Sequence, residues 1–319
     1  MIQDSELKNK IKALFLGQAI GDAMGLGTEF LTKSEIKEYY PKGLKFYNDF
    51  VRDKHRSRWE EACWTDDTDQ FLCICKSIIS HKSVNINAFA EELEKWFKGK
   101  PMGIGKTVNS VLSLPQFVLF PHKASELVWK MGRKNNASNG AIMRTSIVGA
   151  WHFWDWETVK SNTENIAKVT HWDPRCVGSC VIVTYLVSEI LKGNENLDRN
   201  DLRALAKLYD ERILEFIDLS ENPNLEDYEL DDKNTWGYTL KTLSVVLWAY
   251  YHANSFEETL YTIIHQGGDA DTNASVALSV LGAKLGLENI PKDFINGLKN
   301  KEELNYYLEA FINILLQGK

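Results

Sequence analysis

Two acidic segments of the sequence carry oxygen groups of the kind that bind hard metal ions. Each combines a hydroxyl with at least two carboxylates: Thr65, Asp66 and Asp67 in the first segment, and Asp269, Asp271 and Thr272 in the second. Mg²⁺ and Mn²⁺ prefer such oxygen ligands. Apolar residues with helical spacing follow both segments, so we expect each segment at the start of a helix.

Helix capping is the alternative explanation for each segment. A Thr or Asp side chain accepts a hydrogen bond from the first turn, and acidic groups there favour the helix dipole, each by about 1 kcal/mol or less. Capping needs one side chain and one acidic neighbour, and each segment carries more than that. Together with Glu29, the segments bring five negative charges, of which two divalent cations would neutralise four. The sequence therefore predicts two neighbouring ions, Mg²⁺ or Mn²⁺.

A row of glycines precedes Glu29 in the sequence. Gly17, Gly21 and Gly25 are spaced four residues apart, so they share one face of a helix. Because glycine costs about 1 kcal/mol in a helix interior, we interpret the row as a site of close packing against another helix. Glu29 follows the expected helix end and is the functional candidate of this segment.

Three further segments hold candidates for ligand binding. Gly103 and Gly105 precede a helical pattern and could offer backbone N–H groups to a diphosphate, but ordinary loop glycines explain them equally well. Asn139 follows a turn and serves either as a helix cap or to orient a sugar hydroxyl. His171 stands near a helix-starting proline, where a structural histidine is the commoner finding.

Helical periodicity dominates the chain, and good strand candidates are few. The apolar spacing begins at Leu7 and Ile11, and it recurs over residues 68–80, 86–98, 201–218, 239–253, 256–264, 273–286 and 302–316. Residues 181–187 are rich in β-branched side chains, yet their flanks have a helical pattern, so we expect a buried helix there. The sequence predicts an all-α fold.

No repeat and no linker divides the chain, and we expect one domain over residues 1–319. Residues 193–234 are polar and acidic, and we interpret them as a helix with an exposed, peripheral excursion. The five cysteines are odd in number and lack Cys-x-x-Cys pairs, which indicates buried thiols.

The net charge of −7 argues against nucleic acid or an anionic membrane surface as the main partner. A small ligand or another protein remains. The N-terminus lacks the pattern of a signal peptide, and we expect no apolar run of membrane-spanning length. These features indicate a cytoplasmic protein.

An ordered set of motifs runs from residue 12 to about residue 286. Its members are Gly21-Asp22-Ala23 with Glu29, Trp64-Thr65-Asp66-Asp67-Thr68, Gly103-Ile104-Gly105, Ser138-Asn139-Gly140-Ala141-Ile142-Met143-Arg144, Thr170-His171, Trp236-Gly237-Tyr238 and Gly267-Gly268-Asp269-Ala270-Asp271-Thr272. In this order they resemble the ADP-ribosylglycohydrolase family. The resemblance implies a compact all-α fold with a binuclear magnesium or manganese site at the base of a cleft that binds ADP-ribose.

The resemblance also implies roles for single residues. The implied metal ligands are Thr65, Asp66, Asp67, Asp269, Asp271 and Thr272, with Glu29 beside them. The implied substrate-binding residues are Gly103 and Gly105 at the diphosphate, Ser138, Asn139 and Gly140 at a ribose, His171 at the phosphate and ribose, and Tyr238 at the ribose or adenosine. Gly103 stands where arginine-directed bacterial relatives often have aspartate, so an arginine acceptor does not follow from the resemblance.

The resemblance implies metal-dependent removal of ADP-ribose from a modified acceptor, either a protein side chain or a small ADP-ribose derivative, by cleavage at the anomeric carbon of the proximal ribose. Glu29, Asp66 and Asp67 are the catalytic candidates, with Glu29 or Asp67 handling the proton. A terpenoid synthase-like metal enzyme is disfavoured because Gln70, not a carboxylate, follows Asp66 by four residues. A catalytically silent ADP-ribose-binding or structural protein is the main alternative, since fold does not prove activity.

Overall fold

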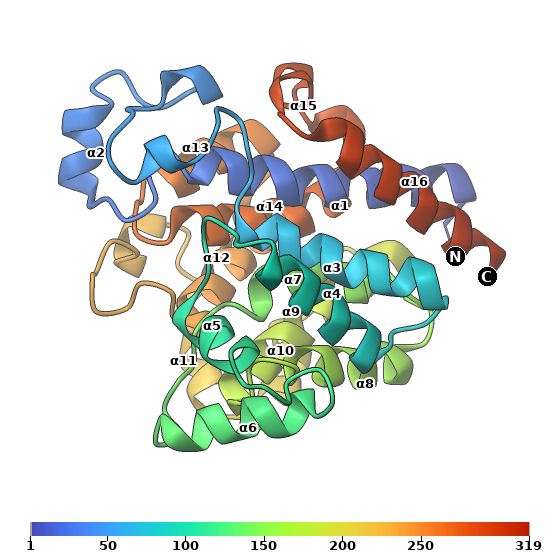
Figure 1. Ribbon diagram of the computed structural model, residues 1–319. Coiled ribbons are helices and arrows are strands. Elements are labelled where there is room, and N and C mark those ends of the chain that lie inside the picture. Colours follow the sequence, from blue (N-terminus) through green and yellow to red (C-terminus); the bar gives the residue numbers. More distant parts are fainter. Residues whose placement is uncertain (1, 319) are drawn as a thin grey trace.

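The computed structural model describes residues 2–318, which form helices and connecting loops with no strand in that range (Figure 1). The α-helices are α1 (Asp4–Gly25), α2 (Lys33–Tyr39), α3 (Asp66–His81), α4 (Ile86–Lys98), α5 (Lys106–Leu112), α6 (Pro121–Met131), α7 (Ile142–Thr145), α8 (Trp156–Ala167), α9 (Pro174–Lys192), α10 (Arg199–Lys207), α11 (Arg212–Leu219), α12 (Thr239–His252), α13 (Phe256–Ile264), α14 (Ala270–Leu285), α15 (Lys292–Gly297) and α16 (Lys301–Gln317). Short 3₁₀ helices span Tyr47–Asp49, Arg56–Arg58, Ser146–Gly149, Leu225–Tyr228 and Leu287–Asn289. The all-α prediction is confirmed.

Helices α1 and α14 lie side by side and make the most extensive helix contact in the fold (Figure 1). The predicted glycine row of α1 forms this contact. A β-carbon on Gly17, Gly21 or Gly25 would overlap the backbone of α14, at Leu278, Ala274 and Asp271, respectively. The prediction of close helix packing is therefore confirmed. Because Gly25 meets Asp271, the contact brings the end of α1, and Glu29 after it, beside the start of α14.

The other helices surround this pair. Helix α3 packs against α4 and α16, α9 packs against α8, and α12 and α13 cover α14. Buried apolar side chains from these helices form one cluster, so the chain folds as a single domain. As predicted, Cys73, Cys75, Cys176 and Cys180 are buried free thiols, whereas Cys63 is half-buried.

Helix α9 corrects one expectation about apolar runs. An 18-residue window of this 19-residue helix, Pro174–Lys192, has a mean hydropathy of 1.4, so the helix is long and apolar enough to cross a membrane by length and composition. The sequence-based expectation that no run approaches this length is therefore wrong. In the structure, 83% of the apolar window is buried inside the protein, as in the core helix of a soluble fold. The buried helix predicted over residues 181–187 is confirmed.

Residues 193–234 contribute more to the core than the sequence predicts. They form two helices, α10 and α11, in place of one helical segment over 201–218. A turn at Asp210 separates the two, because its carboxylate accepts a hydrogen bond from the N–H of Arg212 at 3.0 Å. Leu202 and Ile213 are fully buried, and these helices pack against α9 and α12. The region thus covers the central helices.

Candidate functional site

A cavity of about 710 Å³ opens where the ends of several helices meet. Its walls come from the segment after α1, the starts of α3, α5 and α14, and the loops before α7, α9 and α12. The predicted site residues on these walls are Glu29, Thr65, Asp66, Asp67, Gly103, Gly105, Ser138, Asn139, Gly140, His171, Asp269, Asp271 and Thr272. The volume is within the roughly 300–1,000 Å³ typical of small-molecule sites.

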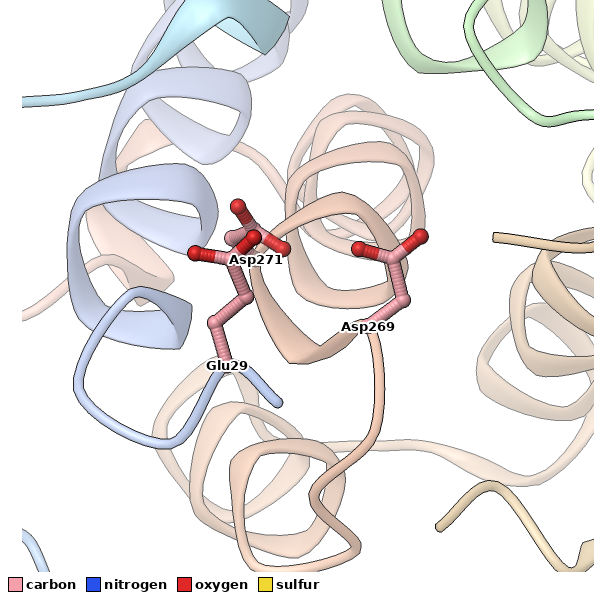
Figure 2. Close-up of side chains that lie close together, drawn as sticks. All are labelled: Glu29, Asp269 and Asp271. Atoms are coloured by element: carbon pink, nitrogen blue, oxygen red, sulfur yellow. The ribbon is translucent and has the colours of Figure 1, made fainter. Parts of the chain in front are cut away.

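One part of the cavity is lined by the carboxylates of Glu29, Asp66, Asp67, Asp269 and Asp271, which we call the acidic wall. Glu29, Asp269 and Asp271 point toward one another (Figure 2), and one oxygen atom from each lies within 4.8 Å of the others. Glu29 follows α1, and the two aspartates begin α14. The close packing of these two helices therefore produces the convergence.

The start of α3 is capped by a residue of another helix. Asp22 of α1 is fully buried, and its carboxylate accepts hydrogen bonds from the backbone N–H groups of Thr65 and Thr68, both at 2.9 Å. It also accepts the Thr68 hydroxyl at 2.6 Å. Within residues 2–318, neither Thr65 nor Asp269 caps its own helix with its side chain. Helix capping therefore does not account for these two residues.

The acidic wall is electrostatically unfavourable on its own. Burial, followed by the negative charges of Asp22 and Glu29, raises the pKa of Asp66 to about 8. Burial and neighbouring carboxylates also raise the pKa of Asp67 and of Asp271 well above the usual range. In the described part of the chain, Oδ1 of Asp67 is buried without a hydrogen-bond partner. Mutually repelling carboxylates and an unpaired buried oxygen fit a divalent cation.

Glu29 is held by two residues that the sequence analysis did not identify. Its Oε2 atom lies 2.7 Å from Nε2 of His55, and its backbone carbonyl accepts a hydrogen bond from the buried guanidinium of Arg56 at 2.6 Å. Burial raises the pKa of Glu29, and His55 opposes this effect. His55 and Arg56 belong to no periodic or motif-like segment, so the sequence offers no signal for them.

The residue after Glu29 ties this segment to the second acidic segment. Phe30 has a φ of 59°, which is uncommon for a side chain of its size, and its N–H donates to the carbonyl oxygen of Gly268 at 2.7 Å. The N–H of Gly268 in turn donates to the carbonyl oxygen of Leu31 at 2.9 Å. These two backbone hydrogen bonds fix Glu29 relative to the start of α14.

Another part of the cavity presents Ser138, Asn139 and His171, which we call the donor wall. Nε2 of His171 lies 2.9 Å from the Ser138 hydroxyl. The Asn139 amide donates to Oδ2 of Asp269 at 2.6 Å, so Asn139 joins the two walls. Gly140 leaves room for the imidazole, because a β-carbon there would lie 2.9 Å from Cε1 of His171.

The two glycines before α5 have different surroundings. A β-carbon at Gly103 would lie 2.8 Å from Oδ1 of Asp66 and 3.4 Å from the ring of Trp59. Among the described residues, nothing lies within 4 Å of the corresponding position at Gly105. Gly103 therefore lets the backbone approach the acidic wall, whereas Gly105 leaves open space for a ligand.

Tyr238 is the predicted site residue that the structure does not place on the cavity wall. Its ring packs against Phe216, with ring centroids 5.6 Å apart, and lies 5.8 Å from the guanidinium of Arg175. Trp236, from the same loop, lines the cavity and stacks on Phe30 with centroids 5.5 Å apart. Trp236 belongs to the Trp236-Gly237-Tyr238 motif, but it was not predicted as a site residue because a loop aromatic carries no periodic signal.

Comparisons with known proteins agree on one family. A family model described as ADP-ribosylglycohydrolase matches residues 3–318. ADP-ribosylarginine hydrolase Tri1 of Serratia proteamaculans is 25% identical over 97% of this chain and 80% of its own. ADP-ribosyl-dinitrogen reductase glycohydrolase of Rhodospirillum rubrum is 25% identical over 91% of this chain and 90% of its own.

A solved structure, described as an ADP-ribosylglycohydrolase-related protein complex, shares the fold. It superposes with a TM-score of 0.74 at 22% sequence identity, covering 97% of this chain and 99% of that chain. Because the coverage is nearly complete for both chains, the likeness extends over the whole fold.

Proposed function

Because the chain belongs to the ADP-ribosylglycohydrolase family, we propose that it hydrolyses the bond between the anomeric carbon of ADP-ribose and an acceptor, with divalent cations on the acidic wall. The observation that carries this proposal is the convergence of five carboxylates on a cavity that also presents hydrogen-bond donors. Such a cavity suits a ligand with both hydroxyl and anionic groups.

The cations proposed here are two ions of Mg²⁺ or Mn²⁺, which prefer oxygen ligands. The residues that would hold them are Thr65, Asp66, Asp67, Asp269, Asp271 and Thr272. When bound, such ions polarise substrate oxygen atoms and make water more acidic. Charge is the basis for two ions, because five carboxylates exceed what one divalent ion neutralises.

Glu29 is the proposed proton-handling group, with Asp67 as the other candidate. Hydrolysis at an anomeric carbon requires stabilisation of a developing positive charge, an oriented water and protonation of the departing acceptor. His55 fixes one oxygen of Glu29, and burial raises the pKa of this carboxyl. Both effects favour a carboxyl group that holds and exchanges a proton at a fixed position.

The donor wall and the glycine segment before α5 are proposed to bind ADP-ribose. The backbone at Gly105 has open space in front of it for the diphosphate, and Ser138 and His171 offer donors nearby. The acceptor is a separate question, because Gly103 has no carboxylate to pair with a guanidinium, and a β-carbon there would lie 2.8 Å from Oδ1 of Asp66. Arginine-linked, serine-linked and O-acetyl ADP-ribose are the acceptor classes to compare.

The proposal is tested by measuring ADP-ribose release, with and without Mg²⁺ or Mn²⁺, from arginine-linked and serine-linked ADP-ribosyl peptides and from O-acetyl-ADP-ribose. Asp269→Ala is the control variant. We expect metal-dependent release from at least one substrate and its loss in the variant. Tight binding of ADP-ribose without release from any substrate would favour the catalytically silent reader, and neither binding nor release would reject the proposal.

A further inference from the structure

Arg144 of α7 is a fully buried arginine whose hydrogen bonds in the described part of the chain go to neutral side chains and not to a carboxylate. Its guanidinium donates to the hydroxyl of Thr170 at 2.6 Å and to Oε1 of Gln70, and it lies 5.0 Å from the ring centroid of Phe89. Burying an unpaired cation is costly. Its two hydrogen-bond acceptors, Thr170 and Gln70, each contact a residue of one wall of the cavity.

The first acceptor, Thr170, determines which ring nitrogen of His171 carries the proton. A guanidinium can only donate, so the Thr170 oxygen accepts from Arg144. The hydroxyl proton of Thr170 is then available for another acceptor, and Nδ1 of His171 lies 2.8 Å away. Nδ1 therefore accepts, and the proton of a neutral imidazole resides on Nε2.

The opposite tautomer would leave a buried proton without a partner. If Nδ1 carried the proton, the Thr170 oxygen would accept from both Arg144 and His171, and its own hydroxyl proton would have no acceptor among the described residues. With the proton on Nε2, the ring donates toward Ser138, whose hydroxyl lies 2.8 Å from that of Thr107. All three of these residues line the cavity. His171, Ser138 and Thr107 are therefore joined by hydrogen bonds along the cavity wall, and the first donor is the Nε2–H of His171.

The second acceptor, Gln70, connects Arg144 to the acidic wall. Because Oε1 of Gln70 accepts from Arg144, its amide nitrogen faces the other way and donates to Oδ2 of Asp66 at 3.3 Å. The guanidinium thus orients a donor toward each wall. Gln70 lies one turn after Asp66 in α3, so this arm also restrains the position of that carboxylate.

We infer that Arg144 is a positioning residue: through Thr170 it holds His171 as a neutral Nε2–H donor to Ser138, which leaves one hydroxyl proton of the Ser138 and Thr107 pair to donate to an anionic oxygen, such as a phosphate oxygen. Naming ADP-ribose as the source of that oxygen rests on the proposed function. Burial, followed by the charge of Arg144, lowers the pKa of His171 to about 3, which agrees with a neutral ring at physiological pH. The imidazole then acts by hydrogen bonding and not by charge.

Thr170 offers the sharpest test because two variants differ in one hydroxyl. Thr170→Val removes the hydroxyl with little change of shape, and Thr170→Ser retains it. Long-range ¹H–¹⁵N spectra of the histidine side chains report the tautomer of the metal-free protein, and His171→Gln identifies the resonances. We expect Nε2–H in the wild type and in Thr170→Ser, and loss of this single tautomer in Thr170→Val.

Calorimetric binding of ADP-ribose supplies the functional readout. The loss of one oriented donor to a charged group should weaken binding by about tenfold in Thr170→Val, with Thr170→Ser close to wild type. An Nδ1–H or doubly protonated ring in the wild type at pH 7, or an unchanged tautomer in Thr170→Val, overturns the inference. If the wild type shows no ADP-ribose binding, the proposed function fails, and the tautomer spectra still decide the inference about Arg144.

Discussion

The acidic wall and the donor wall differ in how their polar atoms find partners. Ser138, Asn139 and His171 of the donor wall each have a side-chain hydrogen bond. On the acidic wall the carboxylates face one another, and Oδ1 of Asp67 has no donor among residues 2–318. The polar atoms of the donor wall thus find partners within the protein, whereas the acidic wall fits a cation.

The walls also differ in what positions them. Backbone-to-backbone contact between α1 and α14 brings Glu29 to the second acidic segment, through glycines that admit no side chain. On the donor wall, by contrast, the hydroxyl of Thr170 connects His171 to Arg144 by side-chain hydrogen bonds. We therefore expect metal ions and pH to affect the acidic wall most, and substitution of single hydroxyl groups to affect the donor wall.

Asp67 and Asp69 provide the strongest test of this difference, because they share one acidic segment. Asp69 accepts hydrogen bonds from the indoles of Trp64 and Trp96, both at 2.9 Å. Asp67→Asn should reduce ADP-ribose release by at least about 100-fold, because loss of a direct metal ligand should affect activity more than loss of a group that supports such a ligand. Asp69→Asn should keep its activity and lose about 1–3 kcal/mol of unfolding free energy.

Release rates per folded molecule, together with denaturant unfolding, separate these two effects. Similar rates for Asp67→Asn and Asp69→Asn would show that the segment is structural and that the acidic wall is wrongly assigned.

Substitutions of Gly103 and Gly105 test whether metal binding by the acidic wall depends on the space that a glycine leaves beside it. In Gly103→Ala the new β-carbon would displace the carboxylate of Asp66, so affinity for Mn²⁺ should fall by about tenfold. Gly105→Ala should leave Mn²⁺ affinity unchanged, because its β-carbon meets no atom of the described chain within 4 Å. Titration calorimetry with Mn²⁺ measures both, and equal affinities in the two variants would contradict this account of Gly103.

Substitution of His55 tests whether its hydrogen bond to Glu29 contributes to activity. Loss of its hydrogen bond in His55→Ala should lower kcat several-fold, up to about tenfold, with little change in KM. His55→Gln keeps an amide donor and should recover much of kcat. Steady-state kinetics on the best substrate provides the comparison. A glutamine variant as slow as the alanine variant would indicate that His55 does not act through this hydrogen bond.

The pH dependence of stability is the smallest expected effect. Because the pKa of Asp66 is raised to about 8, the metal-free folded state binds more protons than the unfolded state above pH 4. Its stability should therefore fall as pH rises through 8, lowering Tm by about 2–4 °C between pH 6 and 8.5. Mg²⁺ should restore more stability at pH 8.5, where the carboxylates are ionised.

Calorimetric scans in chelator and in Mg²⁺ measure this effect, and Asp66→Asn should flatten the metal-free profile. A metal-free Tm that rises over this pH range in the wild type, with the same rise in Asp66→Asn, would contradict the assigned cause.

The sequence predicts those features that depend on local spacing. The long helices, the glycine row of α1 and the helix starts at both acidic segments follow from residue type and period. The pattern also places the buried helix α9, although its apolar length was underestimated. The turn at Asp210 was missed because short polar breaks hardly change an apolar period.

Features that depend on tertiary contacts were not predictable from one sequence. Asp22 caps α3 from another helix, and His55 reaches Glu29 from an irregular segment. Arg144 belongs to a recognised motif, but its contacts with Gln70 and Thr170 arise only when three segments pack together. The residue types of the candidate site could therefore be predicted, and the groups that orient them could not.

Metal removal and restoration test the central claim most directly. The protein would be stripped with a chelator, its metal content verified by elemental analysis, and ADP-ribose release measured before and after Mg²⁺ or Mn²⁺ is returned. We predict that release falls by at least about 100-fold without metal and returns with either ion, but not in Asp67→Asn. Undiminished release from verified metal-free protein would contradict the assignment of the acidic wall as a cation site.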